Sequence, residues 1–548
     1  MNGFQKHLKP IAYSFIGVGS ALILSAGALL LAGTGVFGGP VGKNDQTSDE
    51  TSWGQKPTLP VPESTEYPEG TDLCAVGVHY PVTVTGVKPT CFESGQSDKS
   101  VCEKCGFTLR GSTELPPIAH GNREVLEICL QNHMGFAYQA LFHCPDCDQT
   151  FYNTLEPRDL HMPIINLKGN IGAIDGGTKK PMSVSYMGEG IAFDCDALMR
   201  FQGQSSLLLP KKNYSIQFYK TGTNYQTKQK VELFEGHKES KYCLKANYID
   251  ASQARNIVAA RIYKQISETR DNGDPISQTD TQCVIDGYPV LLYINGNFNG
   301  LYTFNMPKDN WVFDMHKSPD LRQAALFSRH FEATNYLRTH LNFADSNWKM
   351  EFASTEDIPE IGTQWAVNSF NNMIDTLNTL SDAKLREVLP NVVNIDRTID
   401  VVLYTTFLAC YDNRTKNNLY LTYDGVQWAP VMYDMDAAFG LNFDGSGFYA
   451  PNFNAAYTVS GGNNLFQKVS RIYKNEMAAR YRELRQSVLT YENIDAHFAE
   501  FFAGIPQVCY TADFAKNPGI PKKDVNSYGQ IMGFVKERLA YLDSYFGK

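Results

Sequence analysis

The chain has 548 residues, of which 58 are acidic and 49 are basic, and its formal net charge is −9. Apolar residues make up 43% and charged residues 20%, a composition that excludes a wholly disordered chain. The acidic balance argues against a general nucleic-acid-binding protein, because such a protein would carry a basic surface.

The N-terminal residues predict a membrane segment. Residues 1–10 form a short basic segment with Lys6 and Lys9, and residues 11–37 contain no charged side chain. About 20 apolar residues are enough to cross a bilayer, so we expect a transmembrane helix or signal anchor at 11–37. Lysines before such a run favour a cytoplasmic N-terminus, which predicts a single-pass cell-membrane protein with a large extracytoplasmic part. A cleaved signal peptide is the alternative.

A linker and a cysteine-rich module are expected next. Residues 38–70 are rich in Gly, Pro, Ser, Thr and acidic residues, which predicts a flexible linker. Residues 71–158 hold seven of the twelve cysteines. The pairs Cys102–Cys105 and Cys144–Cys147 have a spacing at which two thiolates bind one tetrahedral zinc ion, so we expect a zinc-ribbon-like module with structural Zn²⁺. Disulfides are the alternative, and His133 or His143 are candidate substitute ligands.

Strands dominate the first half of residues 160–548. Local patterns of apolar and polar residues predict strands at 163–167, 182–186, 192–196, 211–218 and 242–246, and a hairpin with an Asn-Gly turn over 290–302. One helix is expected between the last two of these elements. Asp250 or Ser252 is suited to cap it, and it extends to about residue 266.

Helices dominate the second half. Apolar residues at three- and four-residue spacing predict helices at 365–379, 397–409, 466–488 and 528–546. Strands followed by helices predict an α+β fold with two lobes over residues 160–548.

Four polar residues suggest a chemistry. Asp412 and Asn417 lie five positions apart in one loop, and Asp434 and Asp436 follow Asp412 by about 22 and 24 positions. This set suits phosphoryl transfer, in which one Asp orients the acceptor hydroxyl while an Asn and a second Asp hold Mg²⁺. The catalytic loop of ordinary protein kinases has the same Asp-to-Asn spacing. An Asx-turn loop with a structural or calcium-binding carboxylate pair is the alternative.

Several segments match a known family in the expected order. They are Arg200 to Ser206 with Lys211-Lys212-x-Tyr214, Asn247-Tyr248-x-Asp250 with Arg255-Asn256, Tyr293-x-Asn295-Gly296 to Gly300-Leu301-Tyr302, Asp412 with Asn417-Asn418-x-Tyr420, and Asp434-x-Asp436 before Phe439-Gly440. With these segments the region from about residue 162 to 546 resembles the spore coat protein H (CotH) kinase family, atypical protein kinases that phosphorylate Ser or Thr of partner proteins.

The resemblance implies site residues and cofactors. Asp412 matches the catalytic Asp, and Asn417 with Asp434 or Asp436 matches the Mg²⁺-binding set. ATP is the implied nucleotide. Lys212, with Lys245 as the competing candidate, is expected to contact phosphate, and Arg255 to clamp one. A solvated strand lysine and an arginine in a salt bridge are the alternatives for these basic residues.

One departure from the family pattern keeps two hypotheses open. Many members have an acidic residue shortly after the hairpin, where this chain has Asn305-Met306-Pro307-Lys308. The first hypothesis is a membrane-anchored atypical kinase that transfers the γ-phosphate of ATP to Ser or Thr of a surface or spore-coat-type protein. The second is a non-catalytic, pseudokinase-type surface module with a structural or binding role in envelope or coat assembly.

Overall fold

The computed structural model describes residues 68–547 apart from 134, 136, 271–272, 331, 333, 344–346 and 454–461. Met1–Tyr80 and Pro81–Lys548 are separate compact units. The expected basic segment 1–10, the apolar span 11–37 and most of the linker 38–70 lie outside the described residues. Within the described part of the chain, no helix is both long enough and apolar enough to cross a membrane.

The second unit begins with small antiparallel sheets. β1 (Pro81–Val84), β3 (Lys99–Cys102) and β4 (Thr108–Arg110) form one, and β2 (Gly95–Gln96) pairs with β5 (Glu114–Leu115). A third contains β6 (Glu124–Ile128), β7 (Gln139–Cys144) and β8 (Gln149–Thr154). Ala140 and Phe142 of β7 pack into the same large core as the later helices, so this third sheet is part of the main fold.

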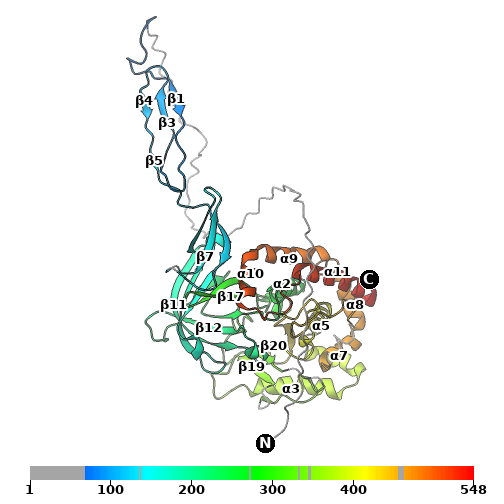
Figure 1. The fold of residues 1–548 in the computed structure, drawn as a ribbon. Coiled ribbons are helices and arrows are strands. Elements are labelled where there is room, and N and C mark those ends of the chain that lie inside the picture. Colours follow the sequence, from blue (N-terminus) through cyan, green and yellow to red (C-terminus); the bar gives the residue numbers. More distant parts are fainter. Residues whose placement is uncertain are drawn as a thin grey trace, which may run out of the picture. The chain divides into compact units, whose positions relative to one another are not determined.

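Seven strands then close into a barrel, coloured from cyan to green in Figure 1. In chain order they are β9 (Ile164–Lys168), β10 (Lys180–Gly188), β11 (Ile191–Gln202), β12 (Asn213–Tyr219), β15 (Lys241–Lys245), β16 (Gly287–Ile294) and β17 (Asn297–Asn305). The short helix α1 (Pro157–Leu160) precedes them, and β13 (Val231–Phe234) pairs with β14 (His237–Glu239) between β12 and β15. Neighbours are antiparallel except β16 and β9, which run parallel. Apolar side chains from alternate positions form a separate core.

Helix α2 (Arg255–Glu268) connects β15 to the rest of the barrel. The prediction that Asp250 or Ser252 caps it needs a correction, because the N-cap position is Ala254. Asp250 and Ser252 nevertheless accept hydrogen bonds from the backbone N–H groups of Arg255 and Ala254, at 3.0 and 3.1 Å.

The second half combines a sheet with helices. The sheet order is β19 (Trp348–Ala353), β18 (Ala324–Ser328), β20 (Asn418–Thr422) and β21 (Ala429–Met432). The helices are α3 (Gln364–Thr379), α4 (Asp382–Val388), α5 (Ile395–Leu408), α7 (Asn464–Ile472), α8 (Lys474–Leu484), α9 (Tyr491–Ala503), α10 (Gln507–Lys516) and α11 (Ser527–Phe546). The single helix predicted at 466–488 is two helices that meet at Tyr473. Mixed α+β structure is confirmed, whereas the two-lobed kinase arrangement stays a prediction.

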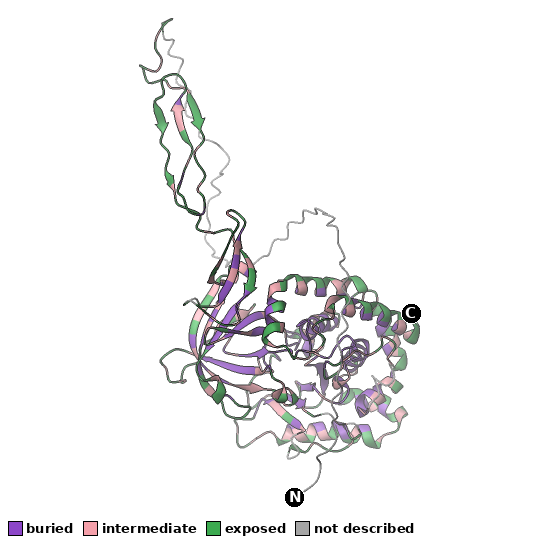
Figure 2. Ribbon diagram, viewed as in Figure 1, coloured by how far each residue is buried: buried purple, intermediate pink, exposed green. Residues whose placement is uncertain are grey.

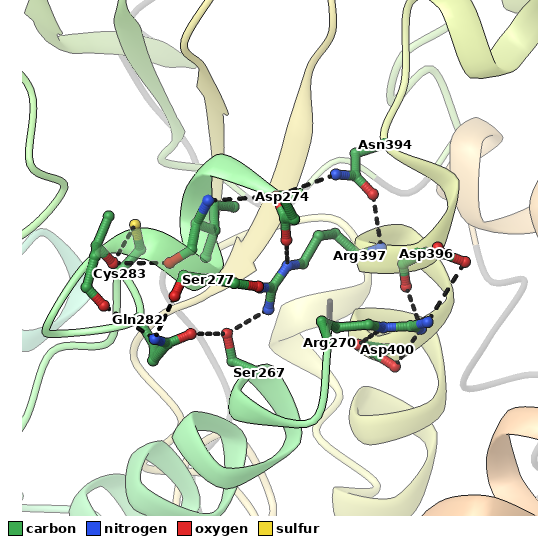
Figure 3. A network of polar contacts seen from close by, with 12 residues as sticks. Ser267, Arg270, Asp274, Ser277, Gln282, Cys283, Asn394, Asp396, Arg397 and Asp400 are labelled. Carbon is green, nitrogen blue, oxygen red and sulfur yellow. Dashed lines mark hydrogen bonds and ion pairs between the residues drawn. The ribbon is translucent and has the colours of Figure 1, made fainter. Parts of the chain in front are cut away.

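Helices α2 and α5 form the buried centre of the helical part (Figure 2). A polar network joins them (Figure 3). The fully buried guanidinium of Arg397 contacts Asp274, Ser267 and Ser277, and Arg270 binds Asp400 at 2.7 and 2.8 Å. Buried charges need such partners because desolvation is costly. The network fixes α5, whose C-terminal end leads into the loop that carries Asp412.

Candidate active site

A cavity of about 1000 Å³ opens between the barrel and the second sheet. That volume is at the upper end of ordinary ligand pockets, and it is large enough for a nucleotide. Strands β15 and β19 and the loops that follow α5 and β21 contribute much of its polar and charged lining, which includes Lys241, Lys245, Lys349, Glu351, Asp412, Lys416, Asn417, Asp434 and Asp436. All four residues predicted from the loop spacing therefore line one cavity.

Asp412 lies in a short turn after α5. Ala409 adopts a left-handed backbone with φ of 51° and ends the helix. Lys416 Nζ donates to Asp412 Oδ2 at 2.9 Å. The buried amide of Asn413 donates to the backbone carbonyl of Tyr433 at 2.8 Å, which ties the turn to the segment that carries Asp434.

Asn417 and Asp434 both have left-handed backbones, with φ of 56° and 59°. Asn and Asp tolerate this conformation better than most residues. The N–H of Asn417 donates to the carbonyl of Ser328 at 3.1 Å, so the end of β18 helps to hold this loop at the cavity. Local backbone conformation thus explains why these two residue types occupy these positions.

Lys245 and Asp434 form an ion pair at the cavity, with Nζ and Oδ1 3.2 Å apart. Burial would raise the pKa of Asp434, but Lys245 and then Lys308 bring it below its ordinary value. Burial and the Asp434 carboxylate instead raise the pKa of Asp436 to about 8. Two neighbouring carboxylates with opposite pKa shifts are typical of functional sites.

The cavity lining contains the type of ligand that a divalent cation takes. Asn417, Asp434 and Asp436 offer amide and carboxylate oxygens, which are ligands that Mg²⁺ prefers. A cation bound there would relieve the repulsion that raises the pKa of Asp436.

A second charged pair was missed from the sequence. Lys308, just after β17, lies 3.4 Å from Glu351 of β19, and both side chains are largely buried. Burial lowers the pKa of Lys308 to about 8, although Glu351 opposes the shift. Glu351 therefore supplies Lys308 with an acidic partner from a distant strand, because the segment Asn305-Met306-Pro307-Lys308 itself contains no acid. The irregular pattern of residues 348–353 gave no signal for it.

The other predicted phosphate contacts lie elsewhere. Lys212 donates to the carbonyl of Leu207 at 2.6 Å, and it is not among the residues that line the cavity. Arg255 is 2% exposed, forms an ion pair with Asp250, and donates to Gln530 at 2.5 Å. Of these three basic residues, only Lys245 lines the cavity.

Lys211, the neighbour of Lys212, forms a buried joint. Its Nζ lies 2.9 Å from Asp513 of α10, and both side chains are fully buried. Asp513 also accepts the backbone N–H of Leu301 at 3.1 Å. Gly300 has φ of 144°, and a Cβ there would lie 2.6 Å from Asp513 Oδ1. The glycine of the hairpin motif is therefore required where β17 meets α10.

The cysteine pairs do not combine as predicted. Cys144 and Cys147 lie with Cys91 and His120, and their ligand atoms are all within 4.8 Å of one another. Cys102 and Cys105 are not members of this group. The correction has a physical reason: β7 and its turn carry the 144–147 pair beside two loops that the spacing of the cysteines could not locate.

One family model matches this chain. It describes the CotH kinase protein family and covers residues 199–542, which is more than half of the sequence. The chain belongs to the CotH kinase protein family. The match includes every cavity residue named above and excludes the cysteine-rich segment. No curated protein matches the chain.

Proposed function

We propose that this CotH-family protein is an atypical protein kinase that transfers the γ-phosphate of ATP to Ser or Thr of a surface or spore-coat-type protein. One observation carries the proposal. Lys245, Asp412, Asn417, Asp434 and Asp436 are spread over almost 200 residues of sequence, and they line one cavity of nucleotide size.

Different cavity residues are proposed to bind the phosphates and the metal ion. Lys245 and Lys308 offer ammonium groups to phosphate oxygens, and both are held by carboxylates. Asn417, Asp434 and Asp436 are the residues that would hold Mg²⁺. Bound Mg²⁺ would neutralise charge on the β- and γ-phosphates, which is the main requirement of phosphoryl transfer.

Asp412 is the proposed acceptor of the hydroxyl proton. Lys416 fixes one of its carboxylate oxygens, and the turn of residues 412–414 fixes its backbone. A Ser or Thr hydroxyl that donates to this carboxylate would be oriented toward the phosphate. General base assistance of this kind contributes typically about 10²–10⁴-fold to rate.

Glu351 argues against the non-catalytic alternative. That alternative drew support from the segment Asn305-Met306-Pro307-Lys308, which lacks an acid, and Glu351 gives Lys308 a carboxylate partner from β19.

Membrane anchoring through residues 11–37 and an extracytoplasmic location are also part of the proposal. They rest on the sequence alone, because that segment lies outside the described residues.

Phosphate transfer tests the proposal directly. Full-length wild type, Asp412→Asn and the control Asp320→Asn are incubated with γ-labelled ATP, Mg²⁺ and a Ser-rich acceptor protein. Asp320 is exposed and outside the cavity, so its variant tests for general effects of losing a carboxylate. We expect labelled phosphoserine with wild type and Asp320→Asn, and a loss of at least about 100-fold with Asp412→Asn. Equal, negligible transfer by all three, with no thermal stabilisation by MgATP, would refute the kinase activity.

A further inference from the structure

The group of Cys91, His120, Cys144 and Cys147 lies outside the family match and outside the cavity. Two of its contacts are short: Cys91 Sγ lies 3.6 Å from Cys144 Sγ, and Cys147 Sγ lies 3.5 Å from His120 Nδ1. We propose that these four residues bind one structural zinc ion with three thiolates and one imidazole.

The distances match tetrahedral zinc. Sulfur lies about 2.3 Å and imidazole nitrogen about 2.0–2.1 Å from zinc, so ligand atoms around one ion are about 3.5–3.8 Å apart. Both contacts fall in this range. A disulfide would require a sulfur–sulfur distance of about 2.05 Å, well below that between Cys91 and Cys144.

The turn between β7 and β8 places the side chains of Cys144 and Cys147 close together. The carbonyl of Cys144 accepts hydrogen bonds from the N–H groups of Cys147 and Asp148, at 3.4 and 2.8 Å. Asp148 has a left-handed backbone with φ of 57°, which closes the turn. Cys144 and Cys147 therefore lie on the same side of a compact loop, as expected of a pair that binds one metal.

His120 is held in place by its neighbours. Its ring packs against Phe151 of β8 at 4.6 Å and edge-on against Phe92 at 5.2 Å between centroids. The N–H of Ile118 donates to the carbonyl of Thr90 at 2.9 Å, which joins the loop of His120 to the loop of Cys91. Both loops thus present their ligands from fixed positions.

The proposed ion would be structural. Four protein ligands complete tetrahedral zinc, so no position remains for a water or substrate. The ion would fasten two loops to the β6–β7–β8 sheet, whose Ala140 and Phe142 are part of the main core. Loss of zinc should therefore increase the mobility of the two loops within residues 90–120. The cavity described above should keep its structure, because other elements form it.

Metal content tests the site. Full-length protein, purified without added chelator under reducing conditions, is analysed for zinc as wild type, His120→Ala and His133→Ala. His133 is an exposed histidine outside the group, so its variant is the matched control. We expect His120→Ala to contain one zinc equivalent per chain less than wild type, and His133→Ala to equal wild type. Equal zinc in wild type and His120→Ala would overturn the proposal.

A second measurement uses only the wild type, in case the variant fails to fold. Thiol alkylation is mapped by peptide mass spectrometry before and after treatment with a strong chelator. Cys91, Cys144 and Cys147 should react at least tenfold faster once the metal is removed. Equal reactivity with and without chelator, or a disulfide between any two of these cysteines, would overturn the zinc site. Neither result depends on kinase activity.

Discussion

Two lysine–aspartate ion pairs in the barrel region differ in what surrounds them. Lys211 and Asp513 are fully buried and 2.9 Å apart, and backbone groups of the β16–β17 hairpin complete their hydrogen bonding. Lys245 and Asp434 are 3.2 Å apart and partly exposed beside Asp436, whose pKa burial and Asp434 raise to about 8. The first pair is a closed structural joint. The second lies beside a carboxyl group that has no basic partner of its own among the ion pairs described, and a bound cation would stabilise its ionised form.

The largest predicted effect is a difference in protein stability between a variant of the buried ion pair and a variant of the cavity. Asp513→Asn leaves the Lys211 ammonium buried and unpaired, so we expect the free energy of unfolding to fall by about 3–5 kcal/mol. Asp436→Asn replaces a carboxyl group that is largely neutral at pH 7, so we expect a change within about 1 kcal/mol. Denaturant unfolding of both variants measures the difference. An equal loss of unfolding free energy in the two variants would contradict the distinction between a structural ion pair and a binding site.

The next effect separates the two candidate phosphate-binding lysines. Lys245→Met removes an ammonium from the cavity, and loss of a charged hydrogen bond of about 1.5–3 kcal/mol corresponds to about 10–150-fold weaker MgATP binding. Lys212→Met is the matched control, because Lys212 donates to the Leu207 carbonyl and lies outside the cavity lining. Calorimetric titration measures both. Weaker binding by Lys212→Met than by Lys245→Met would contradict the assignment.

The smallest effect is a dependence on pH. Burial lowers the pKa of Lys308 to about 8, so the free protein loses this ammonium as the pH rises through 8. Bound phosphate oxygens favour the charged form, so MgATP binding above pH 8 should take up protons, and affinity should fall by at most about tenfold per pH unit. Titrations in buffers of different ionisation enthalpy measure the uptake. Lys308→Arg keeps its charge and should show none; the same uptake in that variant would exclude Lys308 as the source.

Much of the fold follows from local patterns. The alternation at 182–186 and 192–196 predicts strands, and the structure places them in β10 and β11. Barrel closure could not be predicted, because it depends on pairing between distant segments such as β9 and β16. The break at Tyr473 was missed because the apolar spacing continues across it from α7 to α8.

The candidate site likewise contains residues that local sequence predicts and residues that only tertiary contacts bring together. Asp412 and Asn417 were found because they share one loop, and Asp434 and Asp436 because they follow β21, the second strand of the hairpin after that loop. Glu351 and Asp513 were missed because each meets its lysine only through tertiary contact. His120 was missed for the same reason: it belongs to no cysteine motif, and it meets Cys147 through tertiary packing, including that of its ring on Phe151.

The central claim is that the cavity beside Lys245 and Asp434 binds a nucleotide together with a divalent cation. Calorimetric titration of full-length protein with ATP, in Mg²⁺ and then in excess EDTA, tests it most directly, with Asp434→Asn as the site variant and Asp320→Asn as the control. We expect saturable binding by wild type and Asp320→Asn only when Mg²⁺ is present, and a loss of binding in Asp434→Asn. Binding that is equally strong without Mg²⁺, or undisturbed by Asp434→Asn, would contradict the account.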